Sequence, residues 1–530
     1  MTLQLNNNAD IAIIGAGPTG LMLANLLGLH GVKTTIFERR TEPFTEPRAI
    51  AFDPETLRLF QKIDCYDALS KTLQLDVPVH YLNANGKTLA YISDCPPAFG
   101  HSGRGTYYQP ELENALQEGL NSRTAVELRR GIEVGEVRHN EEQVKLRLTS
   151  SVGETSEFTA GYVVDCSGGA SRIRKQLGIN FAGTTYREKW LVIDVEGDDY
   201  EGCEIKFFCD PKRPAVTLPV SNNRRRWEFL VMPGDDETEL ASEESARALM
   251  ATYGAGNAER IERSLVYTFH ARFADRFREG RVLLAGDAAH VMPPFAGQGL
   301  NSGMRDTANL AWKLAGIVQG TFEETILDTY EPERRPHVED MTKLTIKLGQ
   351  SIMPTSAVRA WFRDRMMLTA WRFPKTREKL NRGDMIPKPS IKGSSLVNWA
   401  RGGNVGQMID QPTIIMHGQP VKLDQLLGRG FSAIGLNCDV RNSLCEADCL
   451  LLKELDAAFV SISSSSIQQV DDLKGLFGNL ETTNADKAIL ILRPDRFVID
   501  AFVPSDRRQQ LSWMKEPYGI VRSLVDAQAA

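Results

Sequence analysis

Apolar and polar positions near the start of the chain change period twice within thirty residues. Residues 11–14 (IAII) form a continuous apolar run, residues 18–30 repeat apolar positions at helical spacing, and residues 33–37 (KTTIF) are again β-rich. This order predicts a β-α-β unit, in which a helix joins two parallel strands. Residues 54–62 and 110–120 also have helical spacing, each with a proline at a helix start, where no backbone N–H is needed.

The pattern changes between residues 189 and 232. Four segments there are rich in β-branched and aromatic residues, and Asn222-Asn223 marks a turn between the last two. We therefore expect an antiparallel sheet inserted into the first domain. Its segments read KWLVIDVEG, CEIKFFCD, RPAVTLPV and RRWEFLVMPG.

Helical patterns dominate the region that follows. The apolar run 282–285 leads through a glycine-rich loop into a helical pattern at 304–314. Residues 339–372 are also predicted to be helical. Residues 373–405 are rich in Pro, Gly, Lys and Arg, as in an interdomain linker, and a further α/β segment starts at about residue 406.

The amino-acid composition excludes several classes of binding partner. A chain of 530 residues with a net charge of −6 and scattered Lys and Arg lacks the clustered basic residues of a nucleic-acid or anionic-membrane surface. The eight cysteines contain no C-x-x-C pair, and no zinc-site spacing is present. The N-terminal residues do not resemble a signal peptide, and no apolar run reaches the ~20 residues of a membrane span. We expect a cytoplasmic protein with a small-molecule partner, no nucleic acid, no membrane and no metal.

The first motif lies directly after the strand at 11–14. It consists of Gly15, Gly17, Pro18, Thr19 and Gly20, with Glu38 at the end of the next strand. The first glycine permits a tight turn, the second lets a pyrophosphate approach the helix N-terminus, and the third allows close helix packing. Because Glu38 can accept hydrogen bonds from ribose hydroxyls, the motif predicts a dinucleotide site for either NAD or FAD.

The loop GDAAHVMPPFAGQGLNSG at 286–303 favours FAD. Asp287 follows a strand and can accept hydrogen bonds from a ribityl chain, which NAD lacks. Gly297 and Gly299 let the backbone approach a flat ring. A helix from about Leu300 would direct its positive end at that ring.

These motifs resemble the single-component FAD-dependent aromatic hydroxylases over roughly residues 9–345. The segments RAIAFDPETLRLFQ, CDPKRPA, RRWEFLVMPGD and YTFHARFADRFREGR are most similar to the 3-(3-hydroxyphenyl)propionate hydroxylase branch. The resemblance implies hydroxylation of a small phenolic or heteroaromatic substrate with O2 and NADPH or NADH, through a C4a-hydroperoxyflavin. It also implies that FAD is bound by Glu38, Arg39, Arg48, Gln109, Asp287 and the loop residues Gly297, Gly299, Leu300 and Asn301.

The resemblance places Pro293 and Pro294 at the flavin face and assigns no catalytic base. His290 follows the ribityl acid and is expected to pack structurally. Candidate substrate residues, for which core packing is the alternative, are Tyr107, Trp190, Phe208, Arg213, Trp227 and His270. One departure concerns Ser167, which stands where the family usually has an acid; Asp165 either compensates or ends the preceding strand.

The last segment resembles a degenerate thioredoxin-like domain with predicted strands at 412–416 (PTIIM), 430–435 (GFSAIG) and 489–502 (ILILRPDRFVIDAF). Cys445 and Cys449 are too far apart for a redox C-x-x-C motif, so no redox activity is expected. A packing or homodimer-interface role is expected for this segment. The predicted fold is α/β, with a Rossmann-like FAD-binding domain (1–75, 100–185, 265–345), inserted antiparallel β-rich substrate segments (76–99, 186–264), a helical segment and linker (346–405) and this terminal domain (406–530).

Two alternatives remain at this point. A different flavin chemistry is the first: a dehydrogenase, or a halogenase, for which the expected W-x-W-x-x-P motif is absent. The second is a flavin-binding sensor without catalytic activity. Substrate-dependent oxidation of NAD(P)H coupled to product would exclude the sensor.

Overall fold

The computed structural model describes residues 7–93, 95–384, 386–463, 487–504 and 510–520. Its first sheet confirms the predicted parallel unit, because β1 pairs in parallel with β2 and with β11. The apolar residues of β1 are buried between helices and sheet, and α8 packs on α1. The elements are β1 (Asn8–Ile14), α1 (Pro18–Leu29), β2 (Thr34–Glu38), α2 (Pro54–Lys62), α4 (Gln109–Gly119), β8 (Val126–Arg130), β9 (Ile132–His139), β10 (Val144–Ser150), β11 (Thr155–Asp165), β17 (Arg278–Glu279), β18 (Val282–Leu284) and α8 (Gln298–Val318).

The second sheet contains all four predicted segments and is antiparallel except where β13 pairs with β5. Asn222 and Asn223 form the expected turn, with φ values of 60° and 55°. The strand order is β19 (His290–Val291), β16 (Arg260–Ala274), β12 (Phe181–Glu196), β15 (Arg224–Leu230), β14 (Ala215–Val220), β13 (Ile205–Cys209), β5 (Val79–Asn83) and β6 (Thr88–Ile92).

Helices cover both faces of the second sheet. One face packs on α6 (Glu237–Leu240) and α7 (Glu243–Ala251), and α10 (Ala357–Trp371) covers β6. Residues 339–372, predicted as one helical stretch, are divided: α9 (Tyr330–Ile352) ends before Pro354, whose ring disfavours continuation of a helix. The helix α11 (Pro374–Asn381) lies inside the predicted linker. No helix in the described part of the chain is long and apolar enough to span a membrane.

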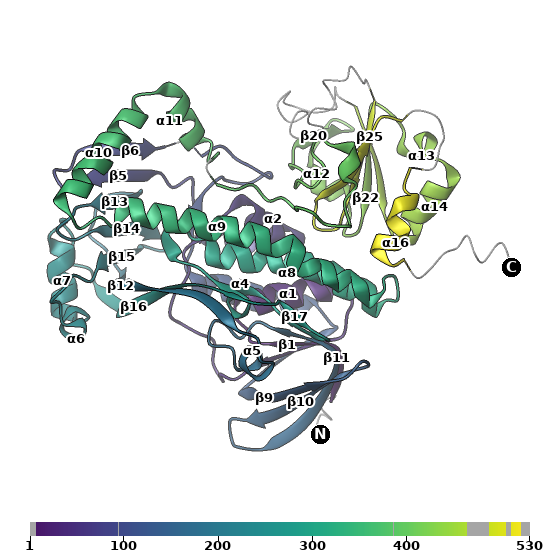
Figure 1. Cartoon of the computed structure of the whole chain (residues 1–530), viewed down its shortest axis with the longest axis horizontal. Helices are drawn as coiled ribbons and strands as arrows, with labels where there is room; N and C mark the ends of the chain where they lie inside the picture. The colour runs from purple at the N-terminus through teal and green to yellow at the C-terminus, as the bar shows by residue number, and fades with distance from the viewer. Residues whose placement is uncertain (1–6, 94, 385, 464–486, 505–509, 521–530) are drawn as a thin grey trace.

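The C-terminal part has its own sheet. In Figure 1 this sheet lies at the upper right, apart from the two larger sheets. Its order is β23 (Ala458–Ile462), β22 (Ser432–Leu436), β24 (Ala488–Leu492) and β25 (Val498–Phe502). The predicted strand at 412–416 is present as β20 (Thr413–Met416), but it pairs with β21 (Gln419–Lys422) in a separate hairpin. The thioredoxin-like assignment stays a prediction.

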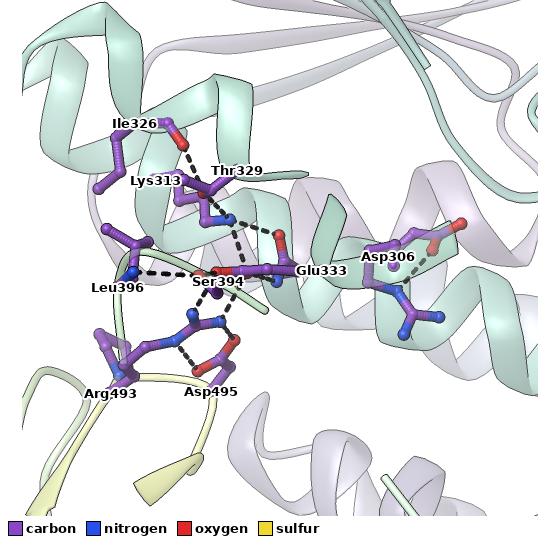
Figure 2. A network of polar contacts seen from close by, with 12 residues as sticks. Asp306, Lys313, Ile326, Thr329, Glu333, Ser394, Leu396, Arg493 and Asp495 are labelled. Carbon is purple, nitrogen blue, oxygen red and sulfur yellow. Dashed lines mark hydrogen bonds and ion pairs between the residues drawn. The ribbon is translucent and has the colours of Figure 1, made fainter. Parts of the chain in front are cut away.

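A buried ion cluster attaches the C-terminal part to the helices α8 and α9 (Figure 2). Arg493, directly after β24, donates two hydrogen bonds to the carboxylate of Glu333 on α9, at 2.7 and 3.1 Å. Lys313 on α8 donates to the same carboxylate at 2.8 Å, and Arg493 also pairs with Asp495. The side chains of these four residues have no solvent exposure. Burial alone would raise the pKa of Glu333, but Arg493 and Lys313 hold it well below its usual range.

Candidate active site

A cleft of about 540 Å³ opens at the carboxyl ends of the parallel strands β1, β2 and β11, where α/β sheets bind their ligands. It meets the N-terminus of α1 on one side and the loop before α8 on the other. The cofactor candidates that line it are Gly15, Gly17, Pro18, Thr19, Glu38, Arg39, Arg48, Gln109, Asp287, Gly299 and Leu300.

The glycines of this cleft differ in what surrounds them. A Cβ on Gly15, whose φ is 100°, would lie 2.7 Å from the carbonyl oxygen of Cys166, and one on Gly20 would lie 2.0 Å from the oxygen of Gly15. Both positions therefore require glycine for packing. By contrast, a Cβ on Gly17 or Gly299 would meet no atom within 4 Å. These two positions leave open space against the backbone, which fits a pyrophosphate at Gly17 and a flat ring at Gly299.

Gly17→Ala tests this assignment. Because its φ of −80° suits any residue and its Cβ site is empty, the apoprotein should keep its melting temperature. The new methyl group would obstruct the closest approach of a pyrophosphate, so the dissociation constant for FAD should rise about tenfold. Flavin fluorescence titration measures the affinity and calorimetry the stability. Unchanged FAD affinity in a folded variant would contradict the placement of the pyrophosphate.

The Gly286-Asp287 turn is held from behind by a buried network. The Gly286 N–H donates to Asp306 Oδ2 at 3.0 Å, and His290 Nε2 lies 2.7 Å from the same oxygen. Arg334 donates to the other oxygen of Asp306 at 2.8 Å. Burial alone would raise the pKa of Asp306, but His290 and Arg334 lower it. His290 thus has a structural position, whereas the carboxylate of Asp287 is exposed to the cleft.

Three cofactor candidates do not line the cleft but shape its walls. Gly20 packs under the turn, and Gly297, with a φ of 64°, starts α8 where a Cβ would lie 2.8 Å from that of Ala51. The amide of Asn301 accepts from the Asp53 N–H and the Thr56 hydroxyl, at 3.0 and 2.6 Å, and so ties α8 to α2.

Gln109 lines the cleft, but its amide is already engaged. Its Oε1 accepts from the N–H groups of Arg48 and Ala49, at 2.9 and 2.8 Å, and its Nε2 donates to Glu113 at 2.7 Å. Gln109 therefore fixes the segment that carries Arg48. The exposed guanidinium of Arg48 stacks on Phe44 beside the cleft.

The loop at 293–296 separates the cleft from an apolar cluster on the second sheet. Pro293 is buried and Pro294 is exposed, while Phe295 packs at ring-centroid distances of 5.8 Å from both Trp190 and Phe269. Trp190 is fully buried, and its indole N–H has no partner among the described residues. Of the substrate candidates, the structure brings Trp190 next to the loop at 293–296.

The other substrate candidates lie elsewhere. Trp227 and Phe208 stack on the sheet face that packs on α7, and Arg213 is held by Asp235 at 2.7 and 3.0 Å, so its guanidinium is already paired. His270 follows Phe269 on β16 and so points to the opposite face, where it lies 3.0 Å from Thr185. Tyr107 is buried in the core of the first domain against Phe52.

Comparison with known proteins assigns the chain to a family. The FAD binding domain family matches residues 8–345, which is more than half of the chain. The chain belongs to the FAD binding domain family of flavin-dependent aromatic hydroxylases. The HcaD C-terminal domain matches residues 406–516.

Curated relatives of this flavoprotein cover nearly its whole length. It is 40% identical to a 3-(3-hydroxy-phenyl)propionate/3-hydroxycinnamic acid hydroxylase 2 of Burkholderia vietnamiensis, over 94% of both chains. It is 34% identical to the corresponding hydroxylase of Klebsiella pneumoniae, over 97% of this chain and 95% of that one. The fold is shared with the flavin-dependent monooxygenase PieE (TM-score 0.79, 19% identity, 97% and 99% covered) and with aklavinone-11 hydroxylase (TM-score 0.77, 21% identity, 98% and 100% covered).

The departure at Ser167 leaves the adjoining turn of this hydroxylase intact. Asp165 is the last residue of β11, and its carboxylate accepts from the Ser167 N–H at 2.9 Å and from the Ser171 hydroxyl. Arg174 donates to the carbonyl oxygens of Gly169 and Ala288, both at 2.8 Å. The Asp165 carboxylate therefore holds the turn internally, and Arg174 connects the turn to the Gly286-Asp287 loop.

Sequence reasoning missed a buried ion triad on the face of the second sheet that carries Trp190. Asp194 on β12 accepts from Arg226 at 2.6 Å and from Arg263 at 2.9 Å. Arg226 also donates to the carbonyl oxygens of Pro47 and Arg48, at 2.7 and 2.8 Å, and so joins the sheet to the Arg48 segment. The available signal was Asp194, an acid placed between Ile193 and Val195 in the segment KWLVIDVEG.

Proposed function

We propose that this hydroxylase adds one oxygen atom to the ring of a small phenol with an acidic side chain, using FAD, NAD(P)H and O2. Its curated relatives carry the names of hydroxylases for 3-(3-hydroxyphenyl)propionate and 3-hydroxycinnamic acid. The observation that carries the proposal is the position of the loop at 286–303, with a dinucleotide cleft on one side and an apolar aromatic cluster on the other. The proposal includes a reaction in the cytoplasm, where NAD(P)H is available.

When bound, FAD supplies the chemistry that accepts reducing equivalents from NAD(P)H and activates O2. The residues of the chain bind and orient it. Asp287 accepts hydrogen bonds from ribityl hydroxyls, Glu38 accepts from the adenosine ribose, and the start of α8 directs its positive end at the ring. The exposed ring of Pro294 and the buried ring of Phe295 exclude water at the boundary between cofactor and substrate.

The aromatic cluster forms the substrate side of this proposal. The antiparallel sheet presents Trp190 and Phe269 toward Phe295, and an aromatic ring fits against such side chains. The unpartnered indole N–H of Trp190 can donate to an oxygen of the substrate.

Trp190→Phe and Trp227→Phe form a matched pair. Both indoles are fully buried with unpartnered N–H groups among the described residues, but they lie on opposite faces of the same sheet. Removing the donor at Trp190 should raise the KM for the substrate about two- to tenfold with little change in FAD affinity, as expected for one neutral hydrogen bond. The Trp227 variant should leave KM unchanged. Equal effects of the two substitutions on KM would refute a substrate contact by Trp190.

The activity itself is tested by following NADH and NADPH oxidation with a panel of phenols, hydroxyphenyl acids, anilines and N-heteroaromatics, with O2 uptake and product mass recorded together. A hydroxyphenyl acid should accelerate oxidation and gain one oxygen atom. Oxidation without an oxygenated product would indicate a different flavin chemistry. A protein that binds FAD but responds to no compound would favour the sensor.

A further inference from the structure

The exposed face of α10 is unusually apolar. Of twelve large hydrophobic side chains that are exposed in the described residues, five lie between residues 358 and 373. Those on α10 recur at helical spacing, so they form one stripe that faces away from the underlying sheet. The five are Val358, Trp361, Phe362, Met366 and Phe373, with exposed fractions of 65, 53, 63, 63 and 59%.

Unpaired positive charges surround this stripe. Residues 357–382 contain eight Lys or Arg and two acids, and the two acids already pair with Arg363 and Arg382. The exposed bases without an ion-pair partner within the described ranges are Arg359, Arg365, Arg372, Lys375, Arg377 and Lys379. Together with the stripe they form a surface, here called the basic face, that is complementary to a negatively charged partner.

The same chain carries such a negative surface. Residues 235–244 contain six acids and no Lys or Arg. Glu239 and Glu244 are exposed and have no ion-pair partner in the part of the chain that the structure describes, and Asp236, Glu237 and Glu243 are also exposed. This segment, here called the acidic face, comprises α6 and the start of α7.

Both faces lie at the same end of the long axis of the molecule. In Figure 1 the helices α10 and α11 occupy the upper left and α6 and α7 the lower left. A two-fold rotation about an axis beside this end, along the viewing direction, would exchange upper and lower positions. The basic face of each copy would then meet the acidic face of the other.

We propose that this protein forms a two-fold symmetric homodimer in which the basic face of one copy packs on the acidic face of its partner. The two-fold axis makes the contact twice, so both apolar stripes lose contact with water, and Glu239 and Glu244 of each copy gain basic partners. Packing of the two basic faces on each other would instead oppose like charges. The C-terminal domain, for which the sequence predicts a packing or homodimer-interface role, is not part of this interface.

Charge reversal tests the pairing. Arg365→Glu with Arg372→Glu reverses the basic face, and Glu239→Lys with Glu244→Lys reverses the acidic face, all at exposed positions. In multi-angle scattering and sedimentation the wild-type protein should be a dimer, and each variant alone should dissociate with a dimer dissociation constant raised at least about tenfold. An equimolar mixture of the two variants should again form a dimer, because both contacts then join opposite charges.

A matched control reverses Arg138 and Lys145 to Glu on β9 and β10, away from both faces, and should remain dimeric. FAD content and circular dichroism confirm that each variant is folded. A monomeric wild-type protein, assemblies larger than a dimer, or a variant mixture that stays monomeric would each overturn the proposal. Phe362→Ser should weaken the dimer without any charge change, and an unchanged dissociation constant would remove the apolar stripe from the interface.

Discussion

Asp287→Ala should release most of the FAD during desalting. The carboxylate faces the cleft without an intramolecular partner among the described residues, and we assign it to the ribityl hydroxyls. A hydrogen bond to a charged group contributes about 1.5–3 kcal/mol, so the dissociation constant for FAD should rise roughly tenfold to a hundredfold. Flavin absorbance after desalting and fluorescence titration of the apoprotein measure the loss.

Asp287→Asn is the control, since it keeps a neutral acceptor of nearly the same size. It should retain more FAD than the alanine variant and should have an apoprotein melting temperature equal to that of the wild type. The network behind the turn contacts Gly286 and Ala288 but not the Asp287 side chain. Full retention of flavin in Asp287→Ala would exclude a ribityl contact.

Arg493→Met should lower the free energy of unfolding by about 3–5 kcal/mol, the usual effect of removing one partner of a buried ion pair. The substitution leaves the buried carboxylates of Glu333 and Asp495 with fewer hydrogen-bond donors. It also removes the two hydrogen bonds that Arg493 donates from the C-terminal part to Glu333 on α9. Lys313 still donates to Glu333 at 2.8 Å, but Asp495 loses its buried ion-pair partner, so Lys313 compensates only in part. Chemical denaturation and protection of residues 406–516 from proteolysis measure the effect.

Arg382→Ala is the matched comparison. Its ion pair with Glu378 is 61 and 58% exposed, so its loss should cost about 0–1 kcal/mol. Equal stability of the two variants would show that the ion cluster contributes no more to domain docking than a surface pair.

Predictions based on neighbouring residues were the most accurate. Pro54 starts α2, Gln109-Pro110 starts α4, and Asn222-Asn223 adopts the left-handed conformations of a tight turn. In each case the information lies within a few residues, because proline restricts φ and asparagine tolerates positive φ. The helix break before α10 was missed, although Pro354 signals it.

Predictions of the substrate residues depended on information that the sequence lacks. Trp190 and Trp227 are both tryptophans in β-rich segments, but Trp227 pairs with Ile193, three positions from Trp190. Because side chains alternate along a strand, an odd offset places the two indoles on opposite faces. Only the pairing register, which is a long-range property, reveals this.

The sequence by itself determined the β-α-β opening, the two glycine motifs of the cleft and membership of the flavin-dependent hydroxylases, because these depend on residue types at short spacing. The tertiary structure decided which face of the second sheet packs against the loop at 293–296, how Asp306 and Arg174 hold the loops of the cleft, and how Arg493 joins the C-terminal part to α9. Those contacts link residues that are from five to 160 positions apart. Most of these contacts join different helices, strands or loops. Packing and charge neutralisation in the folded chain determine which residues pair, and no local sequence pattern does.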